Sequence, residues 1–199
     1  MSKKLNAGAM HEPFLLRLTL VFVDSSVLHG ADKMTVAYAT LGPALSPGWV
    51  TSEKRIWGKY GLDVELVYLG GGARVVPALL GGVNTSQVLL EKNRDMFIRF
   101  LKGYLEGIRF MIGNKEESLK AFTKYLKNSD PAVNNFLYDD ITTRVEKDLR
   151  PNPESVRLML DLIALDHPQA QRVSDKDFWD LSLLDEIQRS GFVQRLYRK

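Results

Sequence analysis

A strand, a helix and a second strand follow one another between residues 34 and 69, and this pattern limits the fold more than any other feature of the chain. Residues 34–38 are β-branched and apolar, and residues 62–69 alternate apolar with polar side chains. Residues 47–60 have the apolar spacing of a helix. Its expected core residues are Trp49, Val50, Ile56 and Trp57. Because such a unit joins parallel strands by a right-handed crossover, the sequence predicts an α/β fold.

Two glycine-marked turns each lead from a predicted strand into a predicted helix. The first covers residues 39–49, where Ser46 is expected to be the N-cap and Pro47 the first helical residue. The second is Gly70-Gly71-Gly72-Ala73-Arg74. At such turns free backbone N–H groups and the positive helix end meet, which favours a site for a small, often anionic ligand. The alternative is that the glycines only permit a tight turn.

The second half of the chain is predicted to be helical. A stripe with a 3.6-residue period indicates a helix over 95–112, and Asn114 with Glu117 is typical of a capping box before a helix over 118–126. The sequence also predicts further secondary-structure elements and helix caps. They are a helix over 73–80, a short strand within 83–90, helices from Asp130-Pro131 to about residue 148 and from Asn152-Pro153 to about residue 165, caps at Ser174 and Ser182, and a last helix end at Ser190-Gly191.

Composition excludes several classes of function. The 27 basic and 24 acidic residues are interleaved and give a net charge of only +3, so no nucleic-acid surface is expected. The chain has no cysteine and only three scattered histidines, so neither a metal centre nor another cofactor is predicted. Adjacent acidic pairs have no neighbouring histidine. No catalytic residue is therefore assigned, and the chain is not expected to be an enzyme.

Residues 14–23 form the one long apolar run of the sequence. The run is too short to cross a bilayer as a helix. It follows Lys3 and Lys4 and precedes small residues, an order typical of an export signal, yet a buried or edge strand fits it equally well. We therefore treat residues 1–32 as a signal-like or extra segment and residues 33–199 as one packed lobe. The chain would be periplasmic or secreted with a signal and cytoplasmic without one.

Several segments in order resemble bacterial ABC-transporter solute-binding proteins of the nitrate, sulfonate, taurine and thiamine-pyrimidine-precursor family. Together they span residues 33–199. They are Met34-Thr35-Val36-Ala37-Tyr38, Trp57-Gly58-Lys59-Tyr60-Gly61-Leu62-Asp63-Val64-Glu65, Gly70-Gly71-Gly72-Ala73-Arg74, Asn84-Thr85-Ser86, Phe100-Leu101-Lys102-Gly103-Tyr104-Leu105-Glu106-Gly107-Ile108, Asn114-Lys115-Glu116-Glu117-Ser118-Leu119, Asp180-Leu181-Ser182-Leu183-Leu184 and Ser190-Gly191-Phe192-Val193.

The resemblance implies a type II periplasmic-binding-protein lobe with a short, mainly parallel sheet and a helical C-terminal half. Family members have two lobes, whereas this chain passes directly from residues 33–82 to 83–199, so most of the second lobe is absent. The implied partners are a small anionic or heteroaromatic ligand and an ABC permease at the membrane. The implied ligand-binding residues are Thr40, Ser46, Trp49, Gly71, Gly72, Ala73 and Arg74.

Three of these residues also have an interpretation in which they serve the fold and bind no ligand. Trp49 has the helical spacing of a core residue, Ser46 that of a cap, and Arg74 that of a solvated surface residue. Without a second lobe, the alternative function is a self-associating or inert single-lobe protein, with a homodimer formed through the face that the missing lobe would cover. A pyrimidine-precursor synthase is the weakest candidate, because such enzymes use a cysteine-rich motif and an active-site histidine that this chain lacks.

Overall fold

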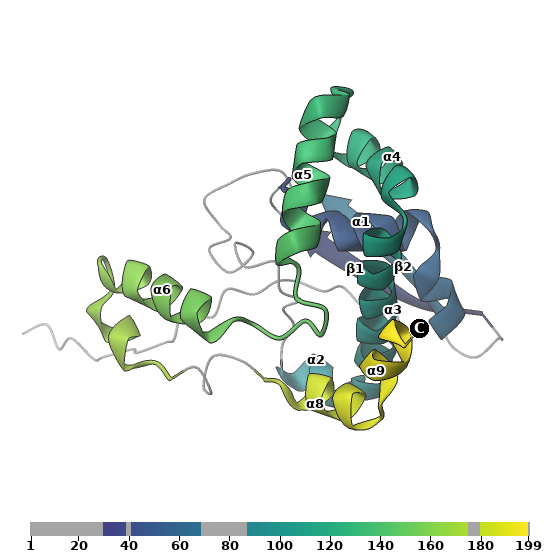
Figure 1. The fold of residues 1–199 in the computed structure, drawn as a ribbon. Helices are drawn as coiled ribbons and strands as arrows, with labels where there is room; N and C mark the ends of the chain where they lie inside the picture. The colour runs from purple at the N-terminus through teal and green to yellow at the C-terminus, as the bar shows by residue number, and fades with distance from the viewer. Residues whose placement is uncertain (1–29, 39–40, 69–86, 175–179, 199) are drawn as a thin grey trace, which may run out of the picture.

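The computed structural model describes residues 30–38, 41–68, 87–174 and 180–198. The described part is a mixed α/β structure that is mostly helical, with one short parallel sheet (Figure 1). The export-signal segment, the triple-glycine turn and the predicted helix over 73–80 lie outside the described residues. No helix among the described residues is long and apolar enough to cross a membrane.

The predicted strand pair is confirmed. Strand β1, Asp32–Tyr38, pairs in parallel with β2, Leu62–Tyr68, in a register that runs from Asp32 opposite Leu62 to Tyr38 opposite Tyr68. The alternation along β2 has its expected cause. Leu62 is buried in the core and Val64 packs against it, while the intervening carboxylates face solvent.

The connection between the strands is helical but not continuous. It consists of the 3-10 turn η1, Pro43–Leu45, the helix α1, Ser46–Glu53, and the 3-10 turn η2, Ile56–Tyr60. The single helix predicted over 47–60 is therefore wrong: it breaks at Arg55, which is left-handed with φ 50°. The break turns the chain so that Trp57 packs on the next long helix, and Gly61, with φ 69°, ends the segment as expected.

Helix α3, Arg94–Gly113, is the centre of the structure, and its predicted apolar stripe is confirmed. The shorter α2, Gln87–Lys92, precedes it. A strand over 83–90 is thus wrong for residues 87–90, where good helix formers outweigh the single β-branched residue. Two glycines let α3 approach its neighbours: a Cβ on Gly103 would clash with Trp57, and one on Gly107 with Thr51.

Helices α4, Lys115–Leu126, and α5, Pro131–Arg144, pack beside α1 around a second apolar cluster. Asp130 caps α5 as predicted, because its carboxylate accepts hydrogen bonds from the Ala132 and Val133 N–H groups at 2.8 and 3.4 Å. The Asn114–Glu117 capping box is wrong. The Asn114 amide donates back to the Phe110 carbonyl instead, at 2.8 Å, and Glu117 pairs with lysines.

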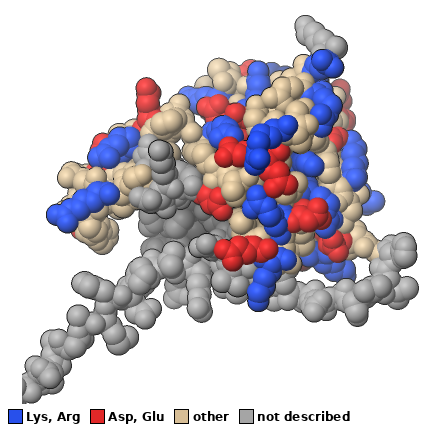
Figure 2. All heavy atoms as spheres, turned by 90° about the horizontal axis from the view of Figure 1, so that it is seen from below, with Lys and Arg blue, Asp and Glu red and all other residues tan. Residues whose placement is uncertain are grey.

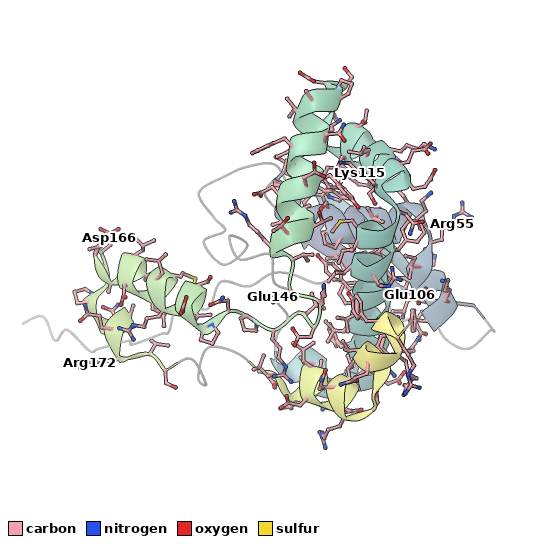
Figure 3. The ribbon with its side chains drawn as sticks, viewed as in Figure 1. Arg55, Glu106, Lys115, Glu146, Asp166 and Arg172 are labelled. Carbon is pink, nitrogen blue, oxygen red and sulfur yellow. The ribbon has the colours of Figure 1, made fainter. Side chains whose placement is uncertain are left out.

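Helix α5 ends at Arg144, before the predicted residue 148, and a non-helical segment, 145–152, with a turn at residues 147–148, leads to α6, Pro153–Ala164. Asn152 caps α6 as predicted. Helix α6 and the 3-10 turn η4, Pro168–Arg172, pack against each other. Both lie apart from the sheet and α3 (Figure 1). Figure 3 shows Asp166 and Arg172 at this outlying end, with Glu146 nearer to α3.

The chain ends with α8, Ser182–Arg189, and α9, Phe192–Tyr197, which pack against α3. Ser182 is not the N-cap that the sequence predicts. Leu181 holds that position, and the Asp180 carboxylate accepts the Ser182 N–H at 2.8 Å. Helix α8 ends before Ser190-Gly191 as expected. Basic and acidic side chains alternate over the face seen in Figure 2, in keeping with the interleaved sequence.

Candidate binding pocket

The structure places only two of the seven predicted ligand-binding residues. Thr40, Gly71, Gly72, Ala73 and Arg74 lie outside the described residues, and their ligand roles stay predictions. Ser46 is fully buried at the start of α1. Its hydroxyl donates to the Pro43 carbonyl at 2.6 Å and also contacts the Met111 sulfur at 3.4 Å. The residue is the first of the helix rather than its cap, and its hydroxyl is used within the protein.

Trp49 is 1% exposed and belongs to the core. Its ring stacks on Tyr125 at 5.3 Å and meets Phe122 edge-on at 6.4 Å. The indole Nε1 makes no hydrogen bond of good geometry, although it lies close enough to Tyr38 to moderate the rise that burial causes in that tyrosine's pKa. Trp49 therefore stands at the carboxyl end of β1 with its face fully packed, which leaves no room to stack a ligand on the ring.

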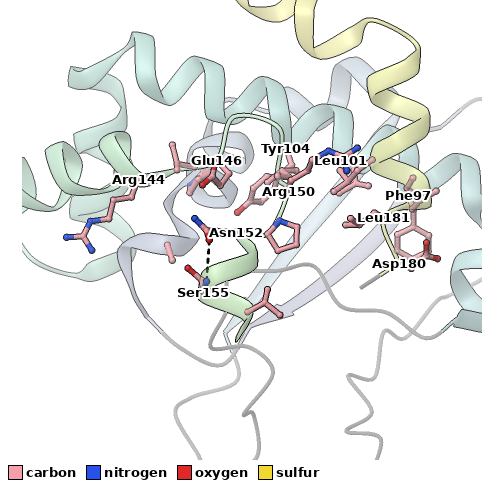
Figure 4. A pocket seen from close by; sticks show the side chains of 18 of the residues that line it. Phe97, Leu101, Tyr104, Arg144, Glu146, Arg150, Asn152, Ser155, Asp180 and Leu181 are labelled. Atoms are coloured by element: carbon pink, nitrogen blue, oxygen red, sulfur yellow. Dashed lines mark hydrogen bonds between the residues drawn. The ribbon is translucent and has the colours of Figure 1, made fainter. Parts of the chain in front are cut away.

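A pocket of about 390 Å³ lies instead between α3, the segment 145–152 and the start of α8 (Figure 4). Its volume falls within the range of small-molecule sites, which is roughly 300–1,000 Å³. Phe97, Leu101 and Tyr104 of α3 form one wall, and Leu181 with its neighbours in α8 forms another. Most of the lining is thus apolar, so a ligand's hydrocarbon surface could leave water there.

The remaining wall is the segment that joins α5 to α6. Val145 has an extended backbone, and Leu149 is left-handed with φ 60°. A leucine in that region is strained by about 1–2 kcal/mol. The strain is balanced by packing, because the Val145 and Leu149 side chains both lie against the core formed by α3. Asn152 and Ser155 complete this wall at the start of α6.

The pocket lining also includes charged side chains. Arg144 pairs with Asp140 at 2.6 Å, and Arg150 pairs with Asp185 at 2.5 Å and with Asp148 at 3.8 Å. Both arginines thus already have carboxylate partners. Asp180 lies at the α8 end, where the hydrogen bond from the Ser182 backbone N–H lowers the pKa of its carboxyl group and keeps it ionised.

Tyr104 contributes a neutral aromatic surface to the pocket. It is 8% exposed, and burial raises the pKa of its phenol to about 12. The ring also packs on Phe100 and Trp57, which fixes it from behind. The α3 wall is therefore rigid and uncharged at physiological pH.

Sequence reasoning missed this pocket. None of its lining residues was predicted as a site, and residues 145–148 were assigned to a helix. The available signal was the charged run Glu146-Lys147-Asp148 after Val145, followed by Pro151-Asn152-Pro153, where each proline disfavours a helical backbone at the residue directly before it. A second hollow of about 650 Å³ lies beside the sheet, and Lys124 and Glu53 at its edge pair with each other.

No group of three or more potential metal ligands occurs within the part of the chain that the structure describes. Comparison of the chain with known protein families, with curated proteins and with solved structures found no match. The chemistry of the pocket and the sequence resemblance described above are therefore the observations that bear on function.

Proposed function

We propose that the chain is a non-enzymatic solute-binding protein that holds a small molecule with an apolar, aromatic or heteroaromatic body. The observation that carries this proposal is the pocket of about 390 Å³ with rigid apolar walls and a few ionic groups. Such a combination is typical of small-molecule sites. A second feature supports it: the left-handed Leu149 lies in one wall, and strained residues gather at ligand sites.

Binding rather than catalysis fits the groups in the pocket. Among the described lining residues, Ser155 is the one serine or threonine, the Tyr104 phenol is buried, and no histidine lines the pocket to accept a proton. Arg150 is held by carboxylates rather than poised over an open position. The lining residues form an apolar surface against which a ligand can be buried, and such burial gives binding affinity without a reaction.

The resemblance to ABC-transporter solute-binding proteins supplies the biological context of the proposal. In that context the chain is a single type II lobe that presents its ligand to a membrane permease. The parallel strand pair and the helical second half agree with such a lobe at the level of an α/β fold. Since the resemblance implies that most of the second lobe is absent, we expect weak capture, with Kd values from about 1 μM to 1 mM.

Isothermal titration calorimetry with the neutral probe 4-phenylbutan-1-ol tests pocket binding. The wild-type chain should release heat on binding, and Leu101→Trp should abolish it, because the larger ring fills the space in front of α3. Leu158→Trp is the control, since Leu158 is exposed on α6 and does not line the pocket. Absence of heat from folded wild-type protein, or equal binding by both variants, would overturn the proposal.

A parallel titration tests the family context. Aminopyrimidines, alkanesulfonates and nitrate represent the heteroaromatic and anionic ligands that the resemblance implies. Binding of any one of them, lost in Leu101→Trp, would connect the pocket to that ligand class. Binding that survives Leu101→Trp would place the ligand elsewhere on the chain, and no binding by any of them would count against the transport role.

Self-association is the second candidate function, and one observation favours it. Leu158 and Leu162 of α6 and its C-cap residue Leu165 are 63%, 59% and 79% exposed and form one stripe along this helix. Exposed apolar stripes mark interaction surfaces. Light scattering after size exclusion should then show a dimer that Leu162→Glu converts to monomer. A wild-type monomer at high concentration would contradict this function.

A further inference from the structure

The charges around the pocket indicate which ligand it accepts. Its ionic lining residues and their ion-pair partners comprise two arginines and five carboxylates. They are Arg144, Arg150, Asp140, Glu146, Asp148, Asp180 and Asp185. These seven groups therefore carry a net charge of −3, with Arg94 acting on Asp180 from outside the lining, although the whole chain carries a net charge of +3. A negative field attracts cations and disfavours anions.

The two arginines are poor receptors for an anionic ligand. The Arg150 guanidinium already binds the Asp185 and Asp148 carboxylates, and Arg144 binds Asp140 one helical turn earlier. An incoming carboxylate or sulfonate would have to displace these internal partners. Figure 4 also shows the Arg144 guanidinium directed away from the other labelled residues.

Glu146 is the lining charge that remains available. Its carboxylate makes no ion pair or side-chain hydrogen bond among the described residues, although its backbone carbonyl accepts from Leu149 N–H at 3.3 Å. It lies in the α5–α6 segment, on the side of the pocket where Figure 4 shows Tyr104 and Arg150. Asp180 stands at the opposite, α8 end and already accepts the Ser182 N–H.

We propose that the pocket binds an organic cation, an amine or ammonium group on an apolar or aromatic body, with Glu146 as the counter-ion of the head group. This inference rests on the proposed function, because it names the ligand class of the same site. The ligand's body packs on the Phe97, Leu101 and Tyr104 wall, whose aromatic faces also attract cations. Its ammonium group lies at the Glu146 carboxylate, where a charge-assisted hydrogen bond can form.

Three probes of nearly the same shape test the proposal by calorimetry: 4-phenylbutylamine, 4-phenylbutan-1-ol and 4-phenylbutyrate. The amine should bind about three- to fivefold tighter than the alcohol, as expected of a partly exposed ion pair, and the carboxylate should bind weakest. Glu146→Gln should reduce the amine's affinity to that of the alcohol and leave the alcohol unchanged. The control Glu116→Gln removes an exposed carboxylate outside the pocket lining and should preserve the amine's advantage.

The outcomes separate the two proposals. If the alcohol binds but the amine gains nothing, or if the carboxylate binds tightest, the cation proposal fails and the proposed binding function stands. The cation proposal also fails if Glu146→Gln leaves the amine's advantage intact. If no probe binds the folded wild-type chain, both proposals fail.

Discussion

The region around α1 and α3 is packed very differently from the region around α6. In the first region Trp57 stacks on Phe100 at 5.1 Å, and Gly103 and Gly107 allow their neighbours to approach closely. In the second, leucines of α6 face solvent. The pocket lies between these regions, with one wall on α3 and another on the segment leading to α6. Helix α3 therefore carries one side of the site, and the other side is carried by a segment that Val145 and Leu149 hold against the same core.

The largest effect is expected from Trp57→Ala in the packed region. The substitution removes a ring that stacks on Phe100 and an indole N–H that donates to the Phe100 carbonyl at 3.0 Å. We expect the free energy of unfolding to fall by about 3–5 kcal/mol. Urea denaturation measures it, with Leu165→Ala at the C-cap of α6 as the contrasting variant, expected to change stability by less than about 0.5 kcal/mol. If both variants lost the same free energy of unfolding, the two regions would not differ in packing.

Gly107→Ala should be the next most damaging change. The added Cβ would meet the Thr51 side chain, whose hydroxyl donates to the Pro47 carbonyl at 2.5 Å and has little freedom to move. Overpacking of this kind costs about 1–3 kcal/mol. Gly58→Ala is the matched control, because a Cβ there meets open space. Thermal melts that show both variants at wild-type stability would mean that α1 and α3 are less closely packed than these contacts indicate.

Two helix caps compare the regions directly. Asp130 caps α5 and Asn152 caps α6, each through side-chain acceptance of two backbone N–H groups. Each change to alanine removes about 1 kcal/mol of helix stabilisation. For Asp130→Ala this should lower global stability, whereas for Asn152→Ala it should mainly accelerate hydrogen exchange within α6. A global loss of the same size from Asn152→Ala would show that α6 folds as one unit with α3.

The smallest expected effect concerns acid stability in the packed region. Hydrogen bonds from Lys120, at 2.6 Å, and from Lys54 lower the pKa of Glu117 to about 2, from the ordinary value of 4.5. Because the folded pKa is depressed, the stabilisation is complete above pH 4.5 and is lost as the pH falls toward 2. Glu117→Gln should flatten this part of the curve of stability against pH. Glu116→Gln should not, and a wild-type curve for Glu117→Gln would refute the assignment.

Local sequence signals predicted the scaffold well. The alternation in β2, the stripe of α3 and the caps Asp130 and Asn152 depend on neighbouring residues, and each is present. The cap predictions failed where another partner competed. The Ser46 hydroxyl donates to the Pro43 carbonyl, the Asn114 amide donates to the Phe110 carbonyl, and the Ser182 hydroxyl accepts an Arg94 N–H at 3.3 Å.

The pocket could not be predicted in the same way. Its walls come from η1, α1, α2, α3, the end of α5 with the segment that follows, the start of α6, and α8, which only tertiary packing brings together. The helical pattern also extended the predicted α5 through Val145, whose backbone is extended in the structure. The predicted glycine-turn residues Gly71, Gly72, Ala73 and Arg74 stay a prediction beside this pocket, because they lie outside the described residues.

Hydrogen exchange of the full chain with and without 4-phenylbutan-1-ol tests the central claim that a small molecule binds between the two regions. Binding should slow exchange over residues 145–156 and 180–184, the ranges that contain many of the lining residues, and should leave α4 unchanged. Leu101→Trp should show no such protection. Unchanged exchange in the wild-type chain at saturating probe, or protection confined to the exposed stripe of α6, would contradict the account.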